Sequence, residues 1–135
     1  MLQLEIMRNS TVYFHYPCFD GLISAVIAAE FLESHEGWHI TDFEPVDYTL
    51  RDAWLSTDLK RPAAVVDFLY HPQAEFWADH HQTSILTSAA KEDFNRRKHR
   101  SSVLFDVRAK SCASPLLGLI DRLASARDTG VTSES

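Results

Sequence analysis

Short apolar runs bounded by polar residues recur along the chain and predict β-strands. Most of these runs contain β-branched or aromatic residues, which favour extended backbone. Residues 63–68 are almost continuously apolar, which predicts a central strand covered on both faces. The predicted strands are residues 11–15, 38–43, 63–68, 76–78 and 102–105.

Longer segments with a helical spacing of apolar residues alternate with these runs. The first has Asp20 as its expected N-cap and Gly37 beyond its end, and the last has Pro115 in its first turn, where proline is tolerated. A polar connection containing Pro45 and a short amphipathic piece at residues 50–55 separate the second and third strands. The predicted helices are residues 21–33, residues 84–100 as one helix or two pieces, and residues 114–124.

The alternation of strands and helices predicts a three-layer α/β domain in which helices flank a mostly parallel sheet. The domain is expected to span residues 11–126. Residues 1–10 show no clear period and are expected to form an N-terminal extension, and residues 127–135 a polar tail. Because parallel strands end at the same edge of a sheet, residues that follow these strands should meet where open α/β folds bind their ligands.

Composition limits the class of protein. The chain has 135 residues, of which 45% are hydrophobic, and this suffices for the core of one domain. A net charge of −6 argues against a protein that mainly coats nucleic acid, because such binding depends on neutralising phosphates. Two cysteines, no leader-like start and no apolar stretch of about 20 residues predict a soluble, reduced, cytoplasmic protein.

Polar residues follow three of the predicted strands at the point where each ends. They lie in His15–Asp20, at Asp67 and in the triplet at 79–81. Carboxylates and imidazoles suit Mn²⁺ or Mg²⁺, and a carboxylate can bridge two ions about 3.5–4 Å apart. We therefore predict a two-metal hydrolase site in which Asp67 bridges, His80 binds metal and His81 donates to a phosphoryl oxygen.

The same residues resemble the motifs of the DHH phosphoesterase superfamily. The matching segments are His15-Tyr16-Pro17-Cys18-Phe19-Asp20-Gly21, Val65–Phe68, Asp79-His80-His81 with residues 82–83, Phe105–Asp106 and Ser111–Ala113. The resemblance covers residues 12–113. It implies the fold of that family's N-terminal catalytic domain and a metal-dependent hydrolase acting on a phosphoester or phosphoanhydride.

Carried over by position, the resemblance implies four metal ligands and two catalytic residues. The implied ligands are His15, Asp20, Asp67 and His80. His81 matches the histidine that contacts the substrate phosphate, and Asp79 matches a residue that supports the histidines. The implied ions are Mn²⁺ or Mg²⁺.

Cys18 stands where many members of the family have an aspartate. A thiolate is softer than a carboxylate, so Cys18 as a ligand would favour Zn²⁺ or Fe²⁺. The alternative is that Cys18 is a small buried hydrophobic residue beneath the first loop. The sequence leaves both interpretations open.

Family members usually have a fourth-motif aspartate and a second, smaller domain that binds the substrate. Neither Asp121 nor Asp128 lies in a convincing fourth motif, so the catalytic domain is expected to be incomplete. One hypothesis is a phosphoesterase for a phosphorylated small molecule or a short oligonucleotide. The other is a truncated or non-catalytic remnant that acts as a binding or regulatory module, or as half of a split enzyme. Uncovered apolar surface predicts a homodimer or a partner that supplies the missing C-terminal domain.

The remaining polar and aromatic features have ordinary structural interpretations. The basic run at residues 96–100 is interpreted as a solvated helix end, with a clamp on substrate phosphates as the alternative. The three tryptophans are interpreted as core or interface residues rather than as a nucleotide-stacking surface. Surface or edge positions are expected for His35, His39, His71 and His99, and a packing role for Cys112.

Overall fold

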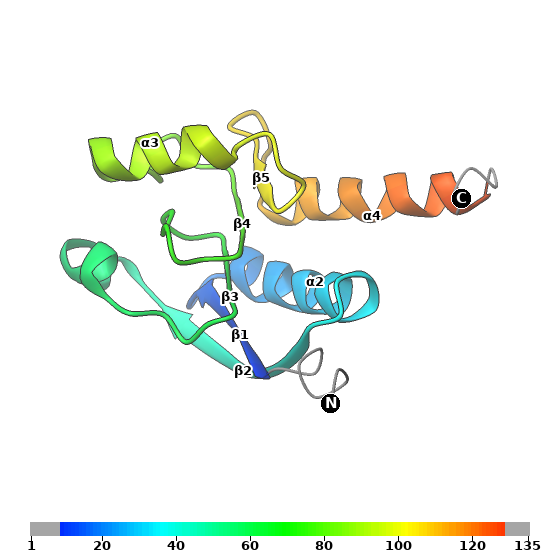
Figure 1. Cartoon of the computed structure of the whole chain (residues 1–135), viewed down its shortest axis with the longest axis horizontal. Coiled ribbons are helices and arrows are strands. Elements are labelled where there is room, and N and C mark those ends of the chain that lie inside the picture. Colours follow the sequence, from blue (N-terminus) through cyan, green and yellow to red (C-terminus); the bar gives the residue numbers. More distant parts are fainter. Residues whose placement is uncertain (1–8, 129–135) are drawn as a thin grey trace.

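The computed structural model describes residues 9–128 and contains a five-stranded sheet (Figure 1). All of the strand pairs are parallel, and the strand order is β2-β1-β3-β4-β5. The strands are β1 (Asn9–His15), β2 (His39–Val46), β3 (Ala63–Val66), β4 (Phe76–Asp79) and β5 (Val103–Phe105). The predicted α/β class is therefore confirmed, with a sheet that is parallel throughout.

Helices cover both faces of this sheet (Figure 1). They are α2 (Phe19–His35), the 3₁₀ segment η1 (Tyr48–Ser56), α3 (Ser88–Arg97) and α4 (Ala113–Asp128). Val12 and Phe14 of β1 pack in one core cluster with residues of α2 and α4. Tyr13, between them, belongs to a second cluster with residues of η1 and α3. This alternation of side chains along a strand produces the three layers.

The path of the chain reverses direction across the sheet at β1. From β1 the chain goes to β2 on one side, and β3 then pairs with the other side of β1. The strand order therefore reverses between β1 and β3, and open α/β folds bind ligands outside the carboxyl ends of the strands at such a point. His15 at the end of β1 and Asp67 directly after β3 occupy this position.

Several element boundaries differ from the prediction. Asn9 and Ser10, expected in the N-terminal extension, belong to β1, and Ser10 is buried. Pro45, expected in a connection, lies inside β2; this is an edge strand, where the missing N–H of proline is tolerated. The helix α3 begins only at Ser88, because Thr87 caps it by accepting from the Ala90 N–H. Residues 1–8 and 129–135 of the predicted extension and tail lie outside the described residues.

Aromatic side chains fill the core on the η1 and α3 face. Trp54 and Trp77 are almost fully buried, as predicted for packing residues. Their indole N–H groups donate to the carbonyls of Leu69, at 3.0 Å, and Phe68, at 2.9 Å. Both polar ends are therefore satisfied inside the core.

The prediction for His71 is wrong. Its side chain is buried rather than at the surface, with its ring centroid 5.1 Å from that of Trp54. Nδ1 accepts from the Gln73 N–H at 3.0 Å, so Nε2 donates to the Thr57 carbonyl at 2.8 Å. Burial lowers the pKa of His71, which favours this neutral form. Over the part of the chain that the structure describes, no helix has the length and apolar character needed to cross a bilayer.

Candidate metal centre

The carboxyl ends of β1, β3 and β4 bring the predicted site residues to one edge of the sheet. His15 ends β1, Asp79 ends β4, and the helix α2 begins immediately after Cys18. Asp67 follows β3 and the two histidines follow β4. Each connection is short, so the polar side chains of separate strands converge. The set brought together is His15, Cys18, Asp20, Asp67, Asp79, His80 and His81.

Asp67 lies at the centre of the set. Its backbone is in the left-handed region, with φ 57°, and its N–H donates to the Ala78 carbonyl at 2.9 Å. The side chain is buried, and Oδ1 has no hydrogen-bond partner among the residues that the structure describes. Burial, together with the nearby charges of Asp20 and Asp79, raises the pKa of Asp67 to about 7. A buried carboxylate that is ionised needs a compensating positive charge nearby.

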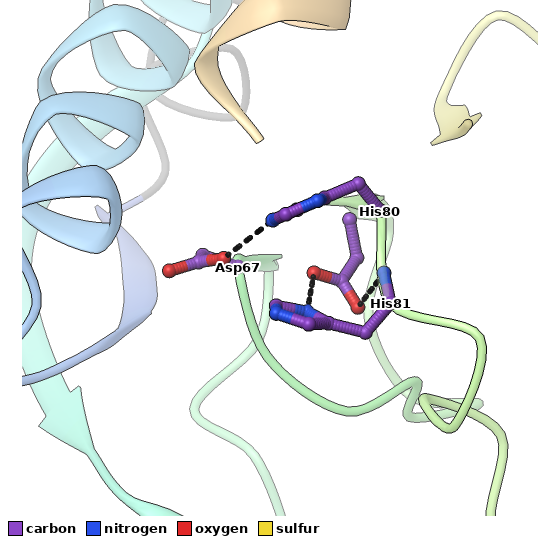
Figure 2. Close-up of side chains that lie close together, drawn as sticks. Asp67, His80 and His81 are labelled. Atoms are coloured by element: carbon purple, nitrogen blue, oxygen red, sulfur yellow. Dashed lines mark hydrogen bonds and ion pairs between the residues drawn. The ribbon is translucent and has the colours of Figure 1, made fainter. Parts of the chain in front are cut away.

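The two oxygens of Asp67 face different partners. Oδ2 lies 3.7 Å from Nδ1 of His15 and 3.5 Å from Sγ of Cys18. Oδ1 lies 3.6 Å from Nε2 of His80 (Figure 2). A carboxylate placed between two sets of donors has the arrangement of a bridging ligand.

The triplet after β4 holds its two imidazoles side by side, with ring centroids 4.2 Å apart (Figure 2). Asp79 is fully buried and lies 2.9 Å from Nδ1 of His81, and it also accepts from the Ser84 hydroxyl. His80 Nδ1 lies 3.1 Å from the Ala109 carbonyl, and this leaves Nε2 directed at Asp67. The outer contact of each ring therefore fixes the direction of its other nitrogen.

Asp20 has a different local role from the one predicted. The N-cap of α2 is Cys18, without a side-chain capping bond, and Asp20 lies in the first turn. Its carboxylate accepts from the backbone N–H groups of Cys112, at 2.8 Å, and Ala113, at 3.3 Å, where α4 begins. Oδ2 also lies 3.5 Å from Nε2 of His80. Asp20 thus joins the metal-centre residues to the start of α4.

Two overlapping groups of side chains have the spacing of metal ligands. One contains Asp67, Asp79, His80 and His81, and the other contains His15, Cys18 and Asp67. In each group the candidate ligand atoms lie within 4.8 Å of one another. The donors are oxygen, nitrogen and sulfur, and Asp67 alone is shared. The buried Oδ1 of Asp67, which has no hydrogen-bond partner among the described residues, fits a cation at this centre, and the donor set does not specify which ion.

Tyr48 is a residue of the centre that the sequence analysis missed. It is the first residue of η1, and its ring centroid lies 4.9 Å from that of His15 and 5.1 Å from that of Phe68. Burial and the nearby charges of Asp79 and Asp67 raise the pKa of Tyr48 to about 12. The signal in the sequence was Asp47, whose side chain caps η1 directly after β2 ends.

The basic run at residues 96–100 lies near the amino ends of the strands, whereas the candidate metal centre lies at their carboxyl ends. Arg97 donates to the carbonyls of Pro72 and Ala74, which precede β4, and pairs with Asp93. The strand ends at the metal centre are on the opposite side of the sheet. The clamp alternative is therefore wrong for this centre, and Arg97 has a structural role.

A thiolate ligand at Cys18 would have a spectroscopic signature. We expect the Co²⁺-loaded protein to show a sulfur-to-metal charge-transfer band that Cys18→Ser removes, because Cys18 lies within ligand distance of His15 and Asp67. Cys18→Asp should shift the preference of the centre toward Mn²⁺ in competition titrations. The matched control is Cys112→Ser. In the wild type the buried thiol of Cys112 donates to the Ala78 carbonyl. An unchanged band in Cys18→Ser would leave Cys18 as a packing residue.

No family model, no curated protein and no solved structure matches this chain. The motifs and the geometry of the centre are therefore the features that bear on function.

Proposed function

We propose that this chain is a metal-dependent phosphoesterase of the DHH type, which hydrolyses a phosphoester or phosphoanhydride. The observation that carries the proposal is the position of Asp67 between two sets of donors, with a buried oxygen that lacks a hydrogen-bond partner among the described residues. His15 and Cys18 would hold one divalent ion with Asp67, and His80 another. Bound ions of this kind polarise a phosphoryl oxygen and lower the pKa of a coordinated water.

His81 supplies the protein's own contribution to phosphoryl transfer. Its Nδ1 is held by Asp79, so Nε2 is the nitrogen left for a substrate. The buried carboxylate holds the ring in place, and Nε2 would contact a phosphoryl oxygen as negative charge develops there. The ring is about two-fifths exposed, which gives a substrate access to it.

His81→Asn separates this role from metal binding. We expect hydrolysis to fall by about a hundredfold, the effect of losing one donor to a developing oxyanion. Mn²⁺ affinity should change by less than about tenfold, because the other donor group does not include His81. The measurements are steady-state hydrolysis and calorimetric titration of Mn²⁺. Equal losses in affinity and rate would instead make His81 a ligand.

The direct test of the proposal is Mn²⁺-dependent hydrolysis of a chromogenic phosphodiester and of pyrophosphate by the purified chain. Asp67→Asn run in parallel controls for contaminating hydrolases, because it alters the residue shared by both donor groups. Hydrolysis that disappears in the variant supports the proposal. Metal binding without hydrolysis of either substrate contradicts it.

A metal-binding module without turnover is the second candidate. It is favoured by the composition of the donor groups, which among the described residues contain none after His81. Asp20 matches a ligand in the family pattern, but its carboxylate also accepts hydrogen bonds from the Cys112 and Ala113 N–H groups at the start of α4. This candidate predicts stoichiometric binding of a divalent ion in the absence of phosphatase or diesterase activity.

A further inference from the structure

A cavity of about 270 Å³ lies at the amino ends of the strands; we call it the apolar cavity. The last turns of α2 and the segments that lead into four of the strands line it, with Phe31, Leu32, Trp38, Pro62, Phe76 and Ser102. The candidate metal ligands instead lie at or beyond the carboxyl ends of their strands. The apolar cavity is therefore a separate site.

The walls of the apolar cavity are fixed by the fold. Phe31, Leu32 and Phe76 are buried members of the core cluster on the α2 and α4 face, and Trp38 packs against the same cluster. The ring centroids of Phe31 and Phe76 lie 6.0 Å apart. These side chains cannot rearrange without disturbing the core, so the cavity is formed before a ligand binds. Aromatic walls favour a small aromatic ligand, because rings in contact gain energy beyond simple burial.

A polar cavity of about 310 Å³ adjoins the apolar cavity, and Glu75 and Ser102 line both. Its cationic side chains are those of Arg61, Arg97 and Arg100. Arg61 and Arg97 each pair with a carboxylate, at 2.7 Å and 3.3 Å. Among the described residues, the Arg100 side chain has no ion-pair partner. Its guanidinium is therefore the positive charge that the polar cavity leaves for a ligand.

We propose that the two cavities together bind a small aromatic carboxylate, whose ring lies in the apolar cavity and whose carboxylate is bound by Arg100. Arg100 is placed for this contact, because Ser101 and Ser102, which directly follow it, line the apolar cavity. A guanidinium offers a carboxylate several N–H donors in a matching plane. Glu36 lines only the apolar cavity, and its charge opposes a ligand that enters with its carboxylate on that side.

The test is calorimetric titration of the full chain, in EDTA, with 2-naphthoate, the neutral 2-naphthamide and the cationic 2-naphthylmethylamine. EDTA removes divalent ions, so the metal centre and the proposed function have no part in the result. We expect the carboxylate to bind about fivefold more tightly than the amide, the upper range for an ion pair exposed to solvent. The amine should bind no more tightly than the amide.

Arg100→Gln separates the charge from the apolar walls. We expect this variant to bind the carboxylate and the amide equally, because it loses the guanidinium and keeps both cavities. Arg96→Gln is the matched control, since Arg96 belongs to the same basic run and pairs with Asp93 but lines neither cavity. It should keep the fivefold preference of the wild type.

Ser102→Leu tests the apolar cavity itself. Ser102 lines both cavities, and leucine would fill part of the space without removing a core side chain. We expect the affinities of the carboxylate and the amide to fall together by at least about tenfold, the effect of crowding an apolar pocket. Urea unfolding of the variant checks that the fold is retained.

Several results would overturn the inference. They are equal affinities of the wild type for carboxylate and amide, tighter binding of the amine, no binding of any of the three, and equal effects of Arg96→Gln and Arg100→Gln. Binding that requires Mn²⁺ in place of EDTA would place the ligand at the metal centre and would also overturn it. A dimer that Ser102→Leu converts to a monomer in sedimentation, without ligand binding, would reassign the apolar cavity to self-association.

Discussion

Replacing Asp67 with asparagine is expected to abolish binding of divalent ions while leaving the fold intact. Both candidate donor groups include Asp67, and an amide carries no charge and only one oxygen, so each group loses a donor. We expect Mn²⁺ affinity to fall by more than about 100-fold, beyond the loss caused by altering a supporting residue. Asparagine suits the position because it tolerates the left-handed backbone of Asp67 better than alanine does.

Stability provides the second readout for Asp67→Asn. In the metal-free protein, the variant should be at least as stable as the wild type, because it removes a buried charge that lies near Asp20 and Asp79. Calorimetric titration and thermal unfolding without metal are the measurements. Asp42→Asn, at an exposed position of the edge strand β2, controls for the loss of one negative charge. Unchanged Mn²⁺ binding in Asp67→Asn would refute the central claim about the site.

Gly21→Ala is expected to destabilise the chain by about 3 kcal/mol, at the upper end of the usual cost of overpacking. Gly21 is buried in the first turn of α2, where a Cβ would collide with the carbonyl oxygen of His15 and lie 3.0 Å from its carbon. Because these are backbone atoms, the collision is relieved only by moving α2 away from β1. This displacement should also weaken Mn²⁺ binding, since the same carbonyl belongs to a candidate ligand.

Gly118→Ala is the matched control for that experiment. Its added Cβ would meet only a side-chain nitrogen of Arg122 at 3.6 Å, which is ordinary contact. Alanine is a better helix former than glycine, so this variant should be more stable by about 1 kcal/mol. Urea unfolding of both variants is the measurement. If Gly21→Ala were as stable as the wild type, α2 and β1 would be less closely packed than described.

The position of the centre could be predicted because apolar runs in the sequence locate the strands, and parallel strands end at the same side of a sheet. Apolar runs identified β1, β3 and β4, and parallel strands end at one edge, so His15, Asp67 and the triplet at 79–81 had to be neighbours. The supporting contact between Asp79 and His81 follows from their adjacency in the chain. These features depend on short-range pattern and on topology alone.

Features that depend on long-range packing escaped prediction. Nothing near His71 in the sequence indicates that Trp54 covers it, and the tolerance for Pro45 follows from the edge position of β2 in the sheet. Tyr48 contacts His15 because Val46, two residues before Tyr48, pairs with His15 between the neighbouring strands β2 and β1. The positions of Pro45 and Tyr48 both depend on which strand became the neighbour of β1.

The hydrogen bond from the Cys112 N–H to Asp20 joins residues 92 positions apart. Contacts of such long range form late, because the loop-closure entropy between their residues has to be overcome first. His80 depends on the same segment, through the Ala109 carbonyl. During synthesis, strands β1 to β4 therefore leave the ribosome before His80 and Asp20 have their partners, the Ala109 carbonyl and the Cys112 N–H. The centre acquires its final arrangement only when the segment leading into α4 has emerged and docked.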